Sequence, residues 1–181
     1  MKKDILDIIE LPEGVNAEIS DKLIKFKGNA GETSQKIIPE VSIEIEGRKI
    51  KVERKKSTKT EKKLLKSFVA HIKKEIKGAN KKYVYKLQIC FVHFPTTVTY
   101  DEKNRELIIK NFLGETVPRK AKILPNVDLT IEGDKITIQS VSKDDAGQCA
   151  ANIEQTTKIR SRDKRIFQDG IWITEKNEKP S

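Results

Sequence analysis

The stretch IIPEVSIEIEGRKIKVE, residues 37–53, is repeated almost unchanged as ILPNVDLTIEGDKITIQ at residues 123–139. Eight of the 17 aligned positions are identical, and three of the others exchange one apolar residue for another. The tripeptide GET also precedes both copies, at residues 31–33 and 114–116. Two copies separated by about half of the 181 residues indicate two tandem homologous domains rather than a solenoid.

Each copy has the pattern of a β-hairpin. Apolar and polar residues alternate over 41–45, with the two-residue period of a half-buried strand. Gly47 can adopt the positive φ that a tight turn often requires, and the alternation resumes at Ile50. The same reasoning predicts an earlier hairpin in each half, at about residues 15–26 and 96–112.

A helix is predicted to close each half. Thr58 and Glu61 match a capping box, in which each side chain bonds the backbone of the other residue. Apolar residues at helical spacing follow over 64–76, and Gly78 is placed to end the helix. A second helix, with smaller apolar residues, is predicted to begin at Ser142.

These elements predict an α+β fold of two tandem homologous domains, each an antiparallel β-sheet of hairpins packed with one α-helix. We expect the first repeat domain at residues 1–80 and the second at residues 81–181.

Composition narrows the classes of partner. The chain is 36% hydrophobic and 35% charged, and its net charge of +10 favours a polyanion such as a nucleic acid. A membrane partner is not expected, because no apolar run approaches the roughly 20 residues of a spanning helix. The first 14 residues mix acidic and apolar side chains, unlike a signal peptide. Two cysteines form no disulfide framework, which favours a reducing compartment.

The excess positive charge lies in two blocks. Residues 54–86 carry 13 basic and only 2 acidic side chains. A solvated helix face would normally mix lysine with glutamate, so we favour a surface that faces phosphate groups, with a solvated face as the alternative. The lysines considered for this possible second basic surface are Lys62, Lys63, Lys66, Lys73 and Lys77.

The second block, residues 158–165, contains three of the chain's few arginines. The planar guanidinium group bonds phosphate oxygens in pairs and stacks on bases. The RNA-binding candidates are Lys158, Arg160, Arg162, Lys164 and Arg165. The alternative is a charged connector before a last strand. Phe167, Ile171, Trp172 and Ile173 follow, and we expect them to anchor the block on the core rather than to stack on bases.

No catalytic or metal-binding motif accompanies these blocks. Cys90 and His93 have a C-x-x-H spacing, but a zinc site needs four ligands and the next cysteine is Cys149. The glycines form neither a phosphate-binding loop nor a dinucleotide fingerprint. We therefore expect that the protein is not an enzyme and that it binds no metal, no cofactor and no small-molecule substrate. The absence of an aromatic RNA-recognition signature or a KH-type loop favours a folded RNA recognised by its shape.

Several segments resemble a known family. HFPTTV, IIKNFLGET, PRKAKILPNV and AANIEQTTKIRSRDKRIFQDGIWITEK are similar to the archaeal and eukaryotic branch of the universal large-subunit ribosomal protein six family, called protein nine in eukaryotic ribosomes. The amino-terminal LPEGVNAEISDKLIKFKGNAGE resembles the opening hairpin of that family, so the resemblance covers essentially the whole chain. The bacterial branch differs at the tail, where this chain has RSRDKRIFQDG.

The resemblance implies two tandem domains and a structural, ribosome-bound cytoplasmic protein that binds large-subunit rRNA. In this family the second domain makes the main RNA contacts, near the sarcin–ricin loop, the stalk base and the translation-factor site. It further implies neighbouring ribosomal proteins of the stalk base as partners. A basic protein–protein adaptor with acidic partners remains the alternative.

Overall fold

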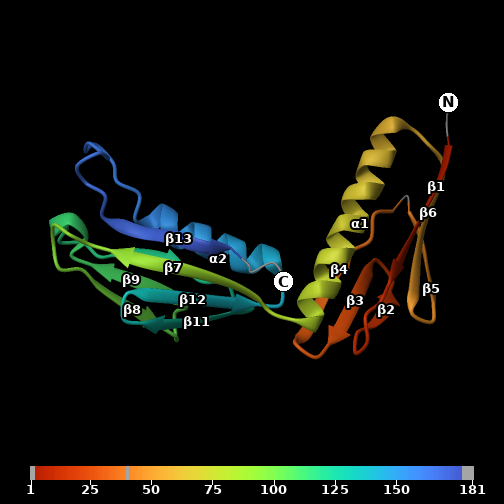
Figure 1. The fold of residues 1–181 in the computed structure, drawn as a ribbon, viewed down its shortest axis with the longest axis horizontal. Helices are drawn as coiled ribbons and strands as arrows, with labels where there is room; N and C mark the ends of the chain where they lie inside the picture. The colour runs from red at the N-terminus through yellow and green to blue at the C-terminus, as the bar shows by residue number, and fades with distance from the viewer. Residues whose placement is uncertain (1–2, 40, 177–181) are drawn as a thin grey trace. The chain divides into compact units, whose positions relative to one another are not determined.

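The computed structural model describes residues 3–39 and 41–176, excluding the side chains of Lys3, Lys55 and Lys56. Contacts within the chain divide it into two compact units, Met1–Lys82 and Tyr83–Ser181. Each repeated segment belongs to a different unit, and each unit contains one long helix and several antiparallel strands (Figure 1). The predicted α+β fold with two tandem homologous domains is confirmed.

The first unit contains two three-stranded antiparallel sheets, ordered β1-β6-β5 and β2-β3-β4. The helix α1 packs along strands of both sheets. The elements are β1 (Lys3–Glu10), β2 (Asn16–Ser20), β3 (Leu23–Gly28), β4 (Gly31–Lys36), β5 (Ser42–Glu46), β6 (Lys49–Ser57) and α1 (Lys59–Asn80).

The second unit repeats this plan and adds an edge strand. Its sheets are ordered β10-β9-β8 and β11-β12-β7-β13, so that β11-β12-β7 corresponds to β5-β6-β1 and β13 is extra. The elements are β7 (Tyr83–Cys90), β8 (Thr97–Asp101), β9 (Glu106–Lys110), the short η1 (Phe112–Gly114), β10 (Arg119–Lys122), β11 (Val127–Glu132), β12 (Lys135–Ser140), α2 (Lys143–Thr156) and β13 (Gly170–Lys176).

The repeated sequence forms the same hairpin twice. Ile45 of β5 pairs with Ile50 of β6, and the corresponding residues pair between β11 and β12. Gly47 and Gly133 occupy the same turn position with φ of 58° and 57°. A side chain would be strained there, which explains why glycine is present in both copies.

The start of α1 is as predicted, but its end is not. The Thr58 hydroxyl accepts the backbone N–H of Glu61 and the Glu61 carboxylate accepts that of Thr58, so the capping box is confirmed. Gly78 lies buried inside the helix, which continues to Asn80, so the prediction that this glycine ends the helix is wrong. Near that end, the backbone of Ala79 lies so close to Gly28 that a β-carbon on Gly28 would clash with it.

Each unit has its own hydrophobic core. Fully buried residues of the first core include Phe26, Leu65 and Phe68. In the second core, the small side chains Ala146 and Cys149 allow α2 to lie close to the sheet. The sheet and α2 thus form the packed core next to the segment that follows α2.

Candidate nucleic-acid interface

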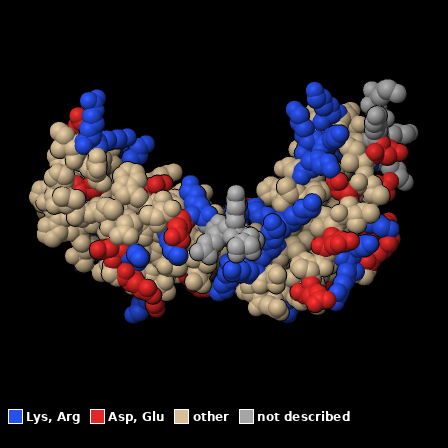
Figure 2. Space-filling view, in the orientation of Figure 1, with Lys and Arg blue, Asp and Glu red and all other residues tan. Residues whose placement is uncertain are grey.

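The five cationic residues predicted to bind RNA lie on one connection between α2 and β13, which we call the basic loop (residues 158–169). All five side chains are exposed: Lys158, Arg160, Arg162, Lys164 and Arg165. Arg165 lies 3.9 Å from the Asp163 carboxylate. Among the residues that the structure describes, no carboxylate lies within ion-pairing distance of the other four. Figure 2 shows blue side chains gathered at this loop.

Arg119 fixes the first end of the basic loop. Its guanidinium donates hydrogen bonds to the carbonyl oxygens of Thr156 and Lys158, at 2.7 and 3.1 Å. It also forms a two-point ion pair with Glu115, at 2.8 and 2.5 Å, and lies 4.2 Å from the centre of the Phe112 ring. The hydrogen bonds from Arg119 hold the pKa of the Glu115 carboxyl below its usual value, against the opposing effect of burial. Because Thr156 is the last residue of α2, the cation also meets the negative end of the helix dipole.

Asp169 fixes the second end of the loop. Its side chain is buried and accepts hydrogen bonds from the backbone N–H groups of Val92 and His93, at 2.5 and 3.2 Å. The His93 ring lies 2.5 Å from the same carboxylate, through Nδ1. Burial alone would raise the pKa of Asp169, but the hydrogen bonds from Val92 and His93 together lower it. The ionised carboxylate therefore ties the loop to the connection between β7 and β8.

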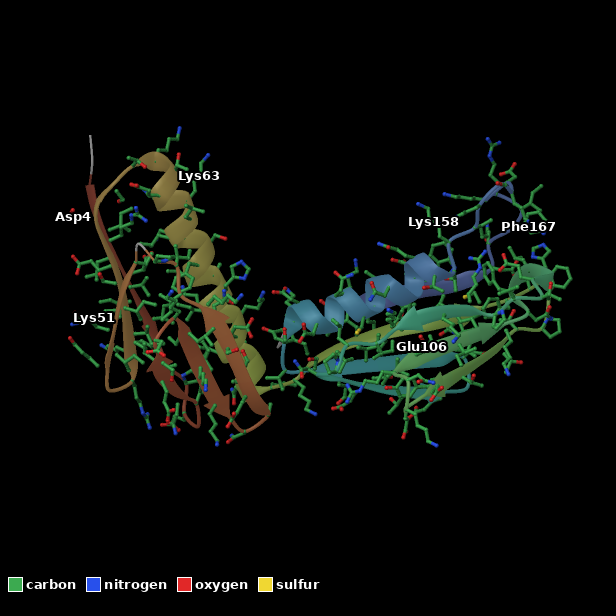
Figure 3. The ribbon with its side chains drawn as sticks, turned by 180° about the vertical axis from the view of Figure 1, so that it is seen from behind. Asp4, Lys51, Lys63, Glu106, Lys158 and Phe167 are labelled. Atoms are coloured by element: carbon green, nitrogen blue, oxygen red, sulfur yellow. The ribbon has the colours of Figure 1, made fainter. Side chains whose placement is uncertain are left out.

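The middle of the loop contains a turn and an aromatic contact. The Asp163 carboxylate accepts the Arg165 N–H at 2.9 Å, and the Asp163 carbonyl accepts the Phe167 N–H at 3.0 Å. The Arg162 guanidinium lies 5.0 Å from the centre of the Phe167 ring, a cation–π distance, and the His93 ring lies 4.8 Å from it. Figure 3 shows Lys158 and Phe167 on the two limbs of the loop.

The apolar residues after the loop divide between the core and the surface. Ile171 is fully buried, and Phe167 and Ile173 pack against the core, as expected. Trp172 is 48% exposed, so the prediction that it anchors the loop on the core is wrong. The reason is the alternation of a strand, which turns Trp172 to the face opposite that of Ile171 and Ile173.

A cleft of about 710 Å³ lies beside the basic loop. It is formed by the loop, the end of α2, the end of β7 and Trp172 of β13. Apolar groups make up most of the wall, and the two loop lysines contribute charge. The lining includes Cys90, Val92, Glu154, Lys158, Ile159, Lys164, Phe167 and Trp172.

The lysines considered on α1 form a second exposed surface, which we call the lysine face: Lys62, Lys63, Lys66, Lys73 and Lys77. Lys66 lies 2.7 Å from the Asp7 carboxylate. The two glutamates of α1 do not contribute to this surface, because Glu61 pairs with Arg54 at 2.9 Å and Glu75 is buried beside Thr33. Figures 2 and 3 show the cationic side chains along α1, with Lys63 near its amino-terminal end.

Sequence reasoning missed the residues that position the basic loop. His93 was considered only as a partner of Cys90, and Arg119 and Asp169 were not singled out. The contacts of Arg119 and Asp169 span 37 and 77 residues of sequence, so a local pattern could not reveal them. A lone acid among apolar residues, in FQDGIWI, was the one signal for Asp169.

The remaining histidine and the two cysteines differ in exposure. His71 is exposed on α1, Cys90 is exposed and Cys149 is buried. Burial raises the pKa of the Cys149 thiol, against the opposing effect of the Leu124 N–H that it accepts. Within residues 3–39 and 41–176, no three His, Cys, Asp or Glu side chains group as metal ligands would. The helices of this part of the chain are also too short or too polar to cross a bilayer.

Comparison with known proteins gives a consistent result over nearly the whole chain. The model of the family "Ribosomal protein L6" matches residues 11–82 and 94–170, once in each unit. The "Large ribosomal subunit protein uL6" of Methanocella arvoryzae is 40% identical over 169 residues, which cover 93% of this chain and 95% of the relative. The protein of the same name from Methanosarcina mazei is 40% identical over 177 residues, which cover 97% and 99%. That from Methanococcus vannielii is 38% identical over 173 residues, which cover 95% and 94%.

The two matches of the family model agree with the internal repeat. The alignments also cover 94–99% of each relative's length. With the family model spanning both units and identities near 40%, the chain belongs to the ribosomal protein L6 family, a family of structural, non-enzymatic ribosomal proteins.

Proposed function

We propose that this chain, as a structural constituent of the large ribosomal subunit, binds large-subunit rRNA mainly through the basic loop of its second domain, which we place at residues 81–181. The observation that carries the proposal is the loop itself. Its five cations are exposed and almost free of acidic partners, while both of its ends are fixed by Arg119 and Asp169. A loop fixed in this way loses little conformational entropy when the cations meet phosphate groups.

The chemistry of the loop suits the backbone of a folded RNA. Lysine and arginine bind phosphate oxygens and release condensed counterions, which gives affinity without reading the base sequence. Specificity then comes from the shape of the RNA. Following the family resemblance, we place the target near the sarcin–ricin loop, at the stalk base beside the translation-factor site. Ribosomal proteins of the stalk base are the proposed neighbours.

The lysine face supports a second, weaker candidate role. Its cations are exposed and the acids of α1 are turned inward, so it can meet a second RNA segment or an acidic protein. A basic adaptor that binds acidic proteins is therefore the alternative function for this chain.

The test is the dependence of RNA affinity on salt concentration. Four to six phosphate contacts predict that log K falls against log salt with a slope of about −3 to −5. The affinity of the full chain for large-subunit rRNA would be measured between about 50 and 200 mM salt. A flat response would contradict the proposal.

Nuclease treatment separates the two candidate functions. An rRNA-binding protein purified from cell extract should lose most of its partners when the RNA is digested, because the RNA holds them together. An adaptor should keep its acidic protein partners after the same digestion.

A further inference from the structure

We propose that the cleft beside the basic loop binds one unstacked nucleotide of the RNA, with the base on Trp172 and the phosphate between Lys158 and Lys164. This inference rests on the proposed function, because it names the part of the RNA that enters the same site. It differs from phosphate binding alone, which requires no cleft and no aromatic surface.

Trp172 offers an aromatic surface that the fold leaves about half exposed. It is the single tryptophan of the chain and is 48% exposed. The indole N–H donates to the Gln168 carbonyl at 3.3 Å, which fixes the orientation of the ring. Among the described residues no other aromatic ring stacks on it. Stacking on an aromatic side chain is a common way for proteins to hold a base that has left its helix.

The lining of the cleft offers apolar surface and a carboxylate acceptor to a base. Val92, Ile159 and Phe167 supply apolar surface for the ring. Glu154, at the end of α2, supplies a carboxylate that can accept an N–H from the edge of a base. The volume of about 710 Å³ lies within the range of about 300–1,000 Å³ typical of small-ligand sites, and it can admit a nucleotide.

Charge selects a nucleotide over other occupants of an apolar cleft. Lys158 and Lys164 both line the cleft, and three arginines stand on the same loop. An apolar peptide would gain little from five cations, whereas the phosphates on either side of an unstacked base would meet them directly. The lysines and Trp172 thus fit the two chemical halves of one nucleotide.

The cleft contains its own reporters. Trp172 is the only tryptophan, and Cys90 is the exposed one of the two cysteines. The full chain would be titrated with two RNA hairpins that differ only in one nucleotide, since one is fully paired and the other contains an additional, bulged adenosine. We expect the bulged hairpin to bind about tenfold more tightly, to quench Trp172 fluorescence and to protect Cys90 from alkylation. The fully paired hairpin should bind without quenching Trp172 fluorescence and without protecting Cys90.

Variants separate stacking from phosphate binding. Trp172→Ala should remove the preference for the bulged hairpin, whereas Trp172→Phe should retain most of the preference. Val117→Ala, which changes another exposed apolar residue outside the cleft lining, is the matched control and should have no effect.

Three results would overturn the inference. Equal affinity and equal fluorescence for the two hairpins would overturn it and leave the proposed function standing. Failure to bind either hairpin would overturn both this inference and the proposed function. Protection of Cys90 in assembled subunits that survives digestion of the RNA would assign the cleft to a protein neighbour.

Discussion

Arg119 positions the basic loop, although it is not one of the five exposed cations. It joins the end of α2, the start of the basic loop and the strand β10 through hydrogen bonds, an ion pair and a ring contact. Lysine could supply the charge at this position. It could not supply a planar fork that reaches two carbonyl oxygens and a carboxylate together.

Replacing Arg119 should therefore loosen the basic loop. We expect Arg119→Ala to lower the free energy of unfolding of the second unit by about 2 kcal/mol, since charged hydrogen bonds to two carbonyls and a carboxylate are lost. Arg119→Lys should restore only part of the stability that Arg119→Ala loses. Urea denaturation followed by Trp172 fluorescence measures the stability, and amide hydrogen exchange over residues 158–162 measures the loosening.

The neighbouring Lys120 provides the control for this prediction. It forms an ion pair with Glu106 at 2.9 Å on the surface, a class of pair that contributes about 0–1 kcal/mol, so Lys120→Ala should change stability little. Unchanged exchange in the basic loop of Arg119→Ala would show that this arginine does not position it.

At the scale of elements, the lysine face and the basic loop differ in how firmly the fold fixes their cationic groups. The lysine face is one side of a regular helix, and its lysines carry flexible side chains. The basic loop holds arginines on a backbone fixed at both ends, with Arg162 resting on Phe167. Prior ordering of the binding groups reduces the entropy lost on association, so the loop should bind RNA more tightly for each cation.

Paired substitutions compare the two surfaces. We expect Arg160→Ala with Arg165→Ala to weaken rRNA binding about tenfold and to reduce the salt slope by about 1.4–1.8, the value for two phosphate contacts. Lys73→Ala with Lys77→Ala removes the same charge from the lysine face and should have a smaller effect. Equal losses of affinity would mean that both surfaces carry the binding.

Elements with local signals were predictable, and those fixed by distant contacts were not. The hairpin β5–β6 follows from alternation and a turn glycine, and the start of α1 follows from its capping box. In contrast, β4 has the polar sequence GETSQK and exists because it pairs with β3. The positions of the five loop cations on one exposed segment were predictable from sequence. Their fixation by Arg119 and Asp169, and the exposure of Trp172, depend on pairings across the fold.

At the scale of the whole molecule, the duplication has produced two hydrophobic cores. Buried residues of each unit form a separate cluster, and the single tryptophan reports on the second unit alone. The second unit also has the extra strand β13, and the basic loop is the connection that this strand requires. The added strand therefore accounts for why the second copy, and not the first, has a loop of this kind.

Because each unit has its own core, a cavity created in one core by a substitution should destabilise that unit alone. Leu65 and Leu107 are both fully buried, one in each core, and replacing either by alanine should cost about 2–5 kcal/mol. Leu65→Ala should lower the urea midpoint of part of the far-ultraviolet circular dichroism signal but leave the Trp172 fluorescence midpoint and the affinity for rRNA unchanged. Leu107→Ala should lower the Trp172 midpoint and weaken rRNA binding where the second unit begins to unfold. A shift of the Trp172 midpoint by Leu65→Ala as large as that by Leu107→Ala would show that the two copies fold as one cooperative unit.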